Sequence, residues 1–310
     1  MPKAACLIVN PAAGGGKGAR LAAPAESELR RLDIAVRRVD TRDLDHGRAL
    51  ALEAARRGET IVALGGDGLL GALADAVRVL PGAVLGLIPG GRGNDLARVL
   101  GISEDPAEAA AVVATGQERS VDLGLVVLDS AEGGGRAFVG IASAGFDSDA
   151  NRIANEAPSW LGGLVYVYGA LRALAAWKPA RIELTLEPSG ERHAFSSFSV
   201  AAANSSTYGG GMRAAPDAML DDGMLDVVLL ESVSKRVFLT RVMPKSFKGT
   251  HVHEPGVHVY RTPEVVLSAD RPFTMYADGD PIAELPVRVR ALPGAVTMLT
   301  PSQPGTAFAR

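Results

Sequence analysis

Three glycine-rich stretches in the first third of the chain carry the residues best suited to chemistry. They read NPAAGGGKG at 10–18, GGDGLLG at 65–71 and PGGRGND at 89–95, and each follows a short apolar run. Glycine lets other atoms approach the backbone closely, and N–H groups at the start of a helix attract anions. The pattern predicts a site for nucleotide phosphates, although three tight strand-to-helix turns without a ligand would give the same spacing.

The first stretch alone does not decide the class of nucleotide site. The GxGxxA pattern at 14–19 fits a loose dinucleotide-binding motif, with Asp40 about where a ribose-binding acid would sit. A P-loop is excluded, because Lys17 is followed by Gly18 and not by Ser or Thr. A hydride-transfer enzyme would leave the second and third stretches unexplained.

Alternating strands and helices are expected to bring these stretches to one sheet edge. The first 120 residues contain short apolar runs separated by helix-like segments, which predicts a parallel, doubly wound sheet with helices on both faces. Ligands bind at the carboxyl edge of such sheets. The runs are 4–9, 34–39, 60–64 and 83–88, and the helical segments are 18–32, 46–57, 69–80 and 105–115.

The character of the sequence changes near residue 122, where a mostly antiparallel β region is predicted to begin. Two helices are expected to interrupt it, at 159–177 and 234–243. The expected strands are 121–128, 136–143, 180–187, 195–204, 224–231, 257–261, 264–269 and 273–277.

Composition narrows the class of protein. The 310 residues are 47% hydrophobic with a net charge of −3, so a full core is expected and nucleic acid is not the expected main partner. The one cysteine, Cys6, is expected to be a buried packing residue, and neither a disulfide framework nor a secretory signal is expected. These features predict a cytoplasmic protein. The apolar tract 160–177 contains Arg172 and three glycines, so it is expected to pack on the core or to line an apolar cleft.

The ordered set of motifs resembles the diacylglycerol kinase catalytic family, most closely its soluble bacterial lipid kinases. Besides the glycine stretches, the resemblance includes GFD at 145–147, the segment 204–230 and DGD at 278–280. It covers essentially the whole chain. It implies an N-terminal α/β domain of the NAD-kinase and phosphofructokinase type, a β-sandwich-like C-terminal domain, and an active site in the cleft between them.

The resemblance also implies domain bounds and a nucleotide site. Residues 1–122 with 290–310 would form the nucleotide-binding domain, and residues 123–289 the lipid acceptor domain. Lys17 would neutralise phosphate charge or be an ordinary exposed lysine, Asn94 would hold the loop or the nucleotide, and Asp95 would cap the helix behind it. The ATP-binding residues would be Asn10, Pro11, Gly14, Lys17, Thr41, Gly65, Gly66, Asp67, Gly68, Arg92, Gly93 and Asn94.

The same resemblance assigns catalysis to three aspartates. Asp280 would be the general base, Asp278 its partner or a metal contact, and Asp67 would act through Mg²⁺ or the nucleotide. Two simpler interpretations stay open, since Asp-Gly is a common turn sequence and Asp67 could cap a helix.

A structural Mg²⁺ site is implied in MLDDGM at 219–224. The Asp222 carboxylate and the main-chain oxygens of Met219 and Met224 would be the ligands, and a turn without an ion is the alternative. A zinc site at His251 and His253 lacks a full set of ligands.

The chain departs from the family pattern at several positions. Leu69, Gly71 and Ala72 stand where relatives commonly carry Thr, Asn and Glu, and Arg92 replaces a threonine. Asp280 is one methylene shorter than the usual glutamate. Either the Arg92 guanidinium supplies what the lost hydroxyls supplied, or the protein is a catalytically impaired nucleotide or lipid binder. A kinase is favoured, because both Asp67 and Asp280 are present.

The expected function is ATP- and Mg²⁺-dependent phosphorylation of a lipid hydroxyl, most simply diacylglycerol to phosphatidic acid, a step of phospholipid biosynthesis. A sphingoid base or a non-lipid alcohol is the alternative acceptor, and NAD kinase activity is disfavoured because that relative lacks the DGD ending. Transient membrane association through apolar residues near Trp160 or Trp177 is expected. A homodimer, as occurs in relatives, is left open.

Overall fold

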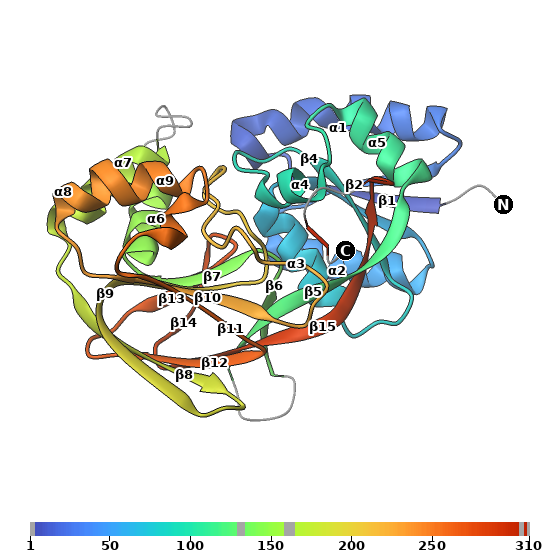
Figure 1. Ribbon diagram of the computed structural model, residues 1–310. Helices are drawn as coiled ribbons and strands as arrows, with labels where there is room; N and C mark the ends of the chain where they lie inside the picture. The colour runs from blue at the N-terminus through green and yellow to red at the C-terminus, as the bar shows by residue number, and fades with distance from the viewer. Residues whose placement is uncertain (1–3, 129–133, 158–164, 304–306, 309–310) are drawn as a thin grey trace. The chain divides into compact units, whose positions relative to one another are not determined.

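The computed structural model describes residues 4–128, 134–157, 165–303 and 307–308. The chain divides into two compact units, labelled by element in Figure 1. Unit 1 comprises Met1–Leu123, Leu220–Asp222 and Pro293–Arg310, and unit 2 comprises Gly124–Met219 and Gly223–Leu292. The three residues 220–222 were expected in the second domain and belong to unit 1.

Unit 1 is built on a parallel sheet, as predicted. Its strand order is β15-β4-β3-β1-β2, and every pairing in it is parallel. The central strands β1, β3 and β4 are almost entirely buried, because helices cover both faces, which explains their continuous apolar runs, whereas the edge strand β2 is partly exposed. The strands are β1 (Ala4–Val9), β2 (Ala35–Asp40), β3 (Thr60–Gly65), β4 (Val84–Pro89) and the end of β15 (Val287–Thr300).

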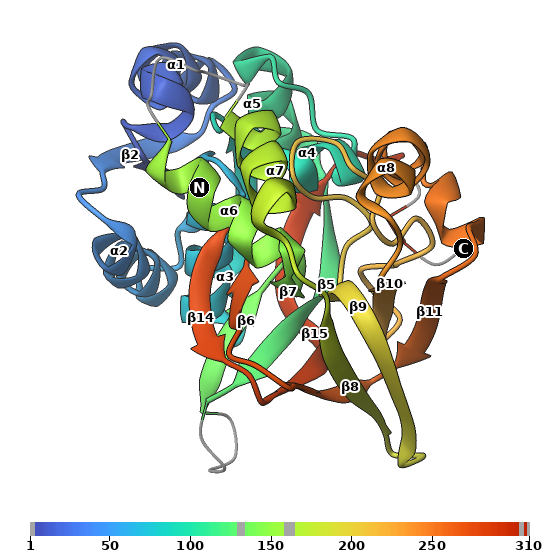
Figure 2. The same cartoon turned by 90° about the vertical axis from the view of Figure 1, so that its left-hand side faces the viewer.

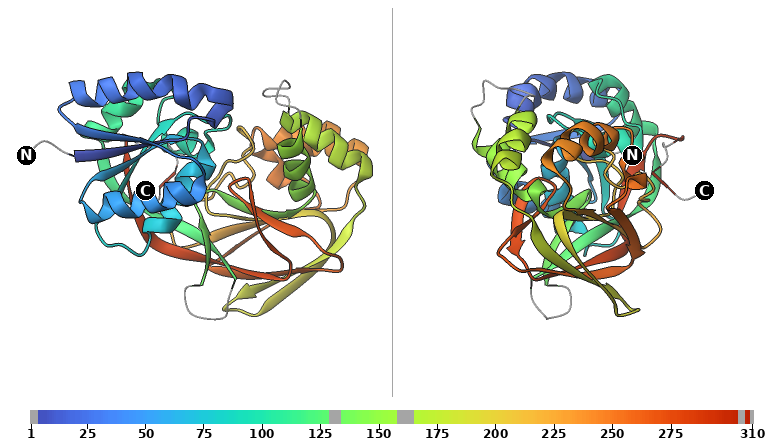
Figure 3. Two further views of the ribbon diagram at one scale, coloured as in Figure 1. Left: turned by 180° about the vertical axis from the view of Figure 1, so that it is seen from behind. Right: turned by 60° about the vertical axis from the view of Figure 1, so that its left-hand side comes forward.

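The helices of unit 1 form the two outer layers. α1 and α5 lie on one face of the sheet, and α2 and α3 lie on the other (Figure 3, left). The short helix α4 is the helix expected behind the third glycine stretch, for which no bounds were predicted. The helices are α1 (Ala13–Arg31), α2 (Leu44–Arg56), α3 (Asp67–Val77), α4 (Asp95–Leu100) and α5 (Pro106–Thr115).

Unit 2 is an antiparallel β structure of the sandwich type. Its strands follow the order β14-β13-β7-β9-β8-β12-β15, and β10 pairs with β9 and β11. The strands are β6 (Gly135–Phe138), β7 (Ile141–Gly145), β8 (Ala180–Glu187), β9 (Glu191–Ala203), β10 (Leu225–Glu231), β11 (Val257–Thr262), β12 (Glu264–Ala269), β13 (Thr274–Ala277) and β14 (Asp280–Glu284), with parts of β5 (Gln117–Val127) and β15.

Four differences from the sequence-based expectation lie in unit 2. The strand expected at 136–143 is two strands, because the chain turns at 139–140, and β14 and β15 were missed. Helix α6 (Phe146–Glu156) was not expected. The expected helix 234–243 is the succession α8 (Lys235–Val237), the π-helical turn η2 (Phe238–Val242) and α9 (Met243–Ser246). Helix α7 (Val165–Ala176) accounts for the described part of the expected helix 159–177.

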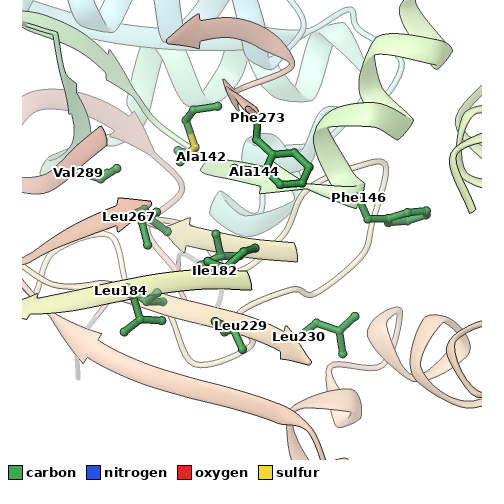
Figure 4. Packing of buried hydrophobic residues seen from close by; sticks show 14 of the residues in the cluster. Ala142, Ala144, Phe146, Ile182, Leu184, Leu229, Leu230, Leu267, Phe273 and Val289 are labelled. Carbon is green, nitrogen blue, oxygen red and sulfur yellow. The ribbon is translucent and has the colours of Figure 1, made fainter. Parts of the chain in front are cut away.

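The helices of unit 2 gather on one side of its strands, away from the β8–β9 turn (Figures 1 and 2). An aromatic cluster lies beneath them, in which Phe146, Trp177, Phe198, Phe238 and Phe273 pack with ring centroids 4.9–6.1 Å apart. Figure 4 shows part of this core, with labelled side chains from β7, β8, β10, β12 and β15.

The apolar residues expected near a membrane lie around Trp160 and Trp177. The Trp177 indole itself is buried and stacks on Phe198 at 5.9 Å between ring centroids, whereas Leu171, in the same helix region, is exposed. Trp160 lies outside the described residues. No helix in the described part of the chain is long and apolar enough to span a bilayer.

Candidate active site

The three glycine stretches meet at the carboxyl ends of β1, β3 and β4 in unit 1. Gly90 N donates to Gly65 O at 2.7 Å, which ties the third stretch to the second. A Cβ on Gly14 would lie 2.6 Å from Gly90 O, and one on Gly91 would lie 2.5 Å from the Gly66 Cα. The backbones therefore pack directly on one another, so part of the glycine content serves this packing and not a ligand.

Other glycines of the first stretch leave open space. The three residues Gly14, Gly15 and Gly16 have φ angles of 59°, 69° and 92°, which interrupts α1 after its first residue. A Cβ on Gly15 would meet no atom within 4 Å. The N-cap residue of α3 is Gly66, which has no side-chain acceptor for the first N–H groups, so the start of α3 suits an anion such as a phosphate. In the first stretch, the glycines separate Ala13 from the regular part of α1, and Ala13 N already donates to Asn10 O at 3.1 Å.

Asp67 lies in α3, but its carboxylate contacts the start of α4. Its Oδ2 accepts a hydrogen bond from Asp95 N and its Oδ1 one from Leu96 N, both at 3.0 Å. Asp67 is therefore the cap of α4, which begins 28 residues later in the chain. The expectation that Asp95 caps this helix is wrong, because the Asp95 carboxylate pairs with Arg98 Nη1 at 2.7 Å.

Asn94 holds the third glycine stretch in place. Its Oδ1 accepts from Gly91 N at 2.8 Å and its Nδ2 donates to Gly91 O at 3.2 Å. Asn94 itself has a φ of 51°, the left-handed conformation that asparagine tolerates better than most residues. The loop is thus preformed, with Gly93 half-buried beside it.

Two cations lie on the glycine stretches. Lys17 Nζ pairs with Glu104 Oε2 at 2.8 Å, and this contact, with a smaller one from Asn94, holds the pKa of Glu104 below its usual value. The Arg92 side chain is exposed and makes no ion pair within the described ranges. Arg92 can therefore turn to a phosphate without breaking an existing contact, whereas Lys17 must share or leave Glu104.

The remaining predicted residues are part of the scaffold. Asn10 Oδ1 accepts from Ala12 N at 3.1 Å, which shapes the turn around the half-buried Pro11. Thr41 is buried, with its N–H donated to Val9 O at 2.7 Å. Gly68 lies in the first turn of α3.

Leu69, Gly71 and Ala72, which replace the polar residues common in relatives, are buried in the same helix. A Cβ on Gly65 would lie 2.8 Å from the Leu69 Cδ2, so the leucine packs against the end of β3. These positions thus contribute to packing and offer nothing polar to a nucleotide.

In unit 2, the DGD motif forms the turn of the β13–β14 hairpin. Ala277 pairs with Asp280, and the two residues between them, Asp278 and Gly279, have φ angles of 50° and 92°. Positive φ at both positions is what a two-residue hairpin turn requires. The Asp278 carboxylate accepts from Val139 N and Gly140 N, each at 2.8 Å, and so fixes the turn between β6 and β7.

Asp280 differs from the other two aspartates. Its side chain is 39% exposed, and the Arg136 Nη2 lies 3.8 Å from the Asp280 Oδ2. A partly exposed carboxylate can accept a proton from a bound hydroxyl.

The turn at 219–224 is fixed by main-chain hydrogen bonds. Leu220 N donates to Ala307 O at 2.8 Å, and Leu220 O accepts from Asp122 N at 2.6 Å. Asp222 is half-buried, and Gly223 has a φ of 71°. Over the described residues, no cluster of three or more His, Cys, Asp or Glu side chains is arranged for a metal. The Mg²⁺ site expected at 219–224 has a different donor set, because it needs only one carboxylate together with main-chain oxygens.

The histidines considered as zinc ligands lie in the 3₁₀ turn η3 (Thr250–His253) and not in a strand. His251 is buried, and burial holds the pKa of its imidazole below the usual value.

An apolar pocket lies within unit 2 and was not predicted residue by residue. It has a volume of about 180 Å³ and is lined by α6, α7, β9, β10 and the η2–α9 segment. The sequence signal was the apolar tract 160–177, and its described part both packs on the core, through Leu174, and lines this pocket, through Val167 and Ala170. The other lining side chains include Phe146, Ala201, Ala214, Val228, Leu230, Phe238, Val242, Met243, Phe247 and His251.

Comparison with known proteins agrees with this architecture. The family described as "Diacylglycerol kinase catalytic domain" matches residues 4–126, and that described as "YegS C-terminal NAD kinase beta sandwich-like domain" matches residues 140–300. The chain is 32% identical over 299 residues to a diacylglycerol kinase of Mycobacterium tuberculosis, covering 95% of this chain and 94% of the relative. It is 30% identical over 234 residues to a diacylglycerol kinase of Bacillus subtilis, covering 74% of each.

The fold also has a solved counterpart. The crystal structure of a diacylglycerol kinase from Bacillus anthracis superposes with a TM-score of 0.72 at 20% identity, covering 97% of both chains. An α/β unit with glycine loops at its sheet edge, followed by a β-sandwich-like unit, defines the class of kinases with an NAD-kinase-type architecture. Within that class, the chain belongs to the diacylglycerol kinase family. It is thus a lipid kinase, an enzyme class that uses ATP.

Proposed function

We propose that this enzyme transfers the γ-phosphate of ATP to the free hydroxyl of diacylglycerol and so makes phosphatidic acid. Two features of unit 2 carry the proposal: an apolar pocket, and the partly exposed carboxylate of Asp280. A diacylglycerol has two acyl chains and one hydroxyl, which need an apolar pocket and a proton acceptor respectively. Relatives at 30–32% identity bear the name diacylglycerol kinase, which supports the same acceptor.

In the proposed reaction, Asp280 accepts the proton of the acceptor hydroxyl as its oxygen bonds to the γ-phosphorus. The bond from that phosphorus to the β–γ bridging oxygen breaks, and ADP leaves. Because the transition state is loose, positioning and charge neutralisation provide most of the acceleration, and Asp280 must come within hydrogen-bond reach of the hydroxyl. Arg136 would help to position the Asp280 carboxylate.

The phosphates are proposed to lie at the starts of α1 and α3. The N–H groups after Gly66 lack a side-chain cap, and the glycine turn before the regular part of α1 leaves room for an anion at Gly15. Arg92 is proposed to pair with a phosphate oxygen and to replace the hydroxyl that relatives have there. The other proposed ATP contacts are Asn10, Pro11, Gly14, Lys17, Thr41, Gly65, Asp67, Gly68, Gly93 and Asn94.

Asp67 and Asp278 are proposed to act mainly by positioning. Each carboxylate already accepts two main-chain hydrogen bonds, so each holds a loop of the site. The remaining lone pairs of Asp67 fit a Mg²⁺ contact, and Mg²⁺, when bound to ATP, offsets the charge of the phosphates.

A second Mg²⁺ is proposed to be held structurally at 219–224. Its ligands would be the Asp222 carboxylate and the main-chain oxygens of Met219 and Met224, all hard oxygen donors. The turn is already held by Leu220, so the ion would add rigidity to an existing conformation.

The test is an acceptor panel. The protein is incubated with labelled ATP and Mg²⁺ against diacylglycerol micelles, sphingosine, glycerol and NAD, and the products are separated. We expect labelled phosphatidic acid, and we expect Asp280→Asn to lower its rate by about 10²–10⁴-fold without a change in stability. Asp270→Asn, which removes the same charge from an exposed turn of unit 2, is the control and should keep full activity.

Each other outcome contradicts a stated part of the proposal. If only sphingosine or glycerol is phosphorylated, that molecule is the acceptor in place of diacylglycerol. If NAD is phosphorylated, the enzyme is an NAD kinase and not a lipid kinase. ATP binding without any product indicates an impaired binding protein. If Asp270→Asn and Asp280→Asn lower the rate of product formation equally, Asp280 is not the base.

A further inference from the structure

The segment that covers the apolar pocket has an unusual charge. Residues 235–248 contain five Lys and Arg residues and no acidic residue, in a chain whose net charge is −3. The segment includes α8, η2 and α9, and its side chains from Phe238 to Phe247 line the pocket. The five cations are Lys235, Arg236, Arg241, Lys245 and Lys248.

Three of these cations have partners within unit 2. Lys235 Nζ donates to Ala175 O at 2.8 Å, which ties α8 to the end of α7. Arg241 and Lys245 both pair with the buried carboxylate of Glu254. Arg236 and Lys248 are exposed and make no ion pair in the described part of the chain. These two charges therefore point to solvent at the two ends of the segment.

Exposed apolar side chains lie on the same segment and on α7. Val167 and Leu171 are 55% and 51% exposed and lie four residues apart, so they share one face of α7. Phe247 is 53% exposed and Val237 is 36% exposed. Val167 and Phe247 also line the pocket. The exposed apolar atoms thus continue from the pocket to the surface.

We propose that these six residues form a docking surface for an anionic phospholipid bilayer. The docking surface consists of Val167, Leu171, Val237 and Phe247, which would enter the interface, and Arg236 and Lys248, which would meet the headgroups. Apolar side chains beside unpaired cations are the combination that binds anionic membranes peripherally. The helices that carry them lie together on one side of unit 2 (Figure 2).

The docking surface explains how a lipid could reach the pocket. Because Val167 and Phe247 belong to both, an acyl chain leaving the bilayer would pass onto apolar side chains and not through water. This consequence rests on the proposed function, in which the pocket takes the lipid acceptor. Binding to the bilayer itself does not depend on catalysis.

The experiment measures sedimentation with vesicles of phosphatidylcholine alone and of phosphatidylcholine mixed with phosphatidylglycerol. We expect the wild type to bind the anionic vesicles more tightly, and added salt to weaken this binding. The double variant Arg236→Glu, Lys248→Glu should bind the anionic vesicles at least about tenfold more weakly. Arg56→Glu, Arg192→Glu is the matched control, with the same charge change at exposed positions outside the docking surface, and should bind like the wild type.

A second variant tests the apolar part. Val237→Asp should also weaken binding to the anionic vesicles, and Val237→Leu should retain it. Circular dichroism checks that each variant is folded. The proposal would be overturned if the wild type did not bind anionic vesicles. It would also be overturned if the two double variants lost vesicle binding equally. A dimer that Arg236→Glu, Lys248→Glu separates without any effect on vesicle binding would overturn it too, because the surface would then join two copies of the chain.

The failure of docking and the failure of the proposed function give different results. If the protein phosphorylates diacylglycerol but the variants bind vesicles like the wild type, the docking surface is wrong and the function stands. If the wild type binds anionic vesicles through these residues but phosphorylates no diacylglycerol, the function is wrong and the docking surface stands.

Discussion

At the scale of single residues, three aspartates of similar sequence context have different environments. Asp67 and Asp278 each accept two main-chain N–H groups, and Asp280 is accessible beside Arg136. A carboxylate that accepts main-chain hydrogen bonds holds the donating segments in place. The capping and turn interpretations therefore apply to Asp67 and Asp278, although Asp67 caps α4 and not its own helix.

Cys6 offers a prediction that depends on burial alone. Its thiol lies in the middle of β1, and burial, partly offset by Arg37, raises its pKa from 9.0 to about 11. The folded protein therefore holds this proton more tightly than the unfolded chain. Between about pH 9 and pH 11 the unfolded chain releases the proton first, so stability should fall as pH rises through this window, by about 2–3 kcal/mol.

Urea denaturation of the wild type and of Cys6→Ala over this pH window checks the prediction. Raised pKa values of Tyr260 and Tyr276, both caused mainly by burial, affect the two proteins alike. The difference between the two curves therefore isolates Cys6. Parallel curves for the two proteins would show that the thiol is not the cause.

At the scale of elements, Asp67 connects the second glycine stretch to α4 across 28 residues. We predict that Asp67→Ala lowers the free energy of unfolding by about 2–4 kcal/mol, because two N–H groups lose a charged acceptor. Asp67→Asn keeps one acceptor oxygen and should lose less. ATP affinity should fall with stability in both variants, because α4 follows directly on the third glycine stretch.

Chemical denaturation together with calorimetric ATP binding measures both effects. Asp105→Ala is the matched control, because the Asp105 carboxylate caps α5 through one exposed contact with Ala107 N. This substitution should lower the free energy of unfolding by about 1 kcal/mol. If Asp67→Ala is as stable as the wild type but inactive, the residue is catalytic and its capping contacts contribute nothing measurable.

At the scale of the whole molecule, each unit has its own hydrophobic core and is expected to bind its own substrate. We predict that a non-hydrolysable ATP analogue slows amide exchange at the starts of α1, α3 and α4 in unit 1. A short-chain diacylglycerol should slow exchange in α7 and η2 of unit 2. Ligand at about 100 times its Kd adds about 2.7 kcal/mol, so protected amides should exchange about 100-fold more slowly.

Hydrogen exchange followed by mass spectrometry measures amide protection in both units in one experiment. Protection by the ATP analogue confined to unit 2, or by the lipid confined to unit 1, would reverse the proposed division between nucleotide and acceptor. A variant with a filled pocket, Ala201→Phe, should lose lipid protection and keep protection by the ATP analogue.

The sequence by itself determined the parallel sheet, its strand bounds to within a residue or two, and the three glycine stretches at its edge. Local signals sufficed there, because strands covered on both faces, such as β1, β3 and β4, form apolar runs, and backbones that pack directly on one another require glycine. The tertiary structure decided which amides Asp67 and Asp278 hold, that Trp177 is buried, and that apolar residues of several elements line one pocket. These facts arise from contacts between segments far apart in the chain, which no local spacing of residues can encode.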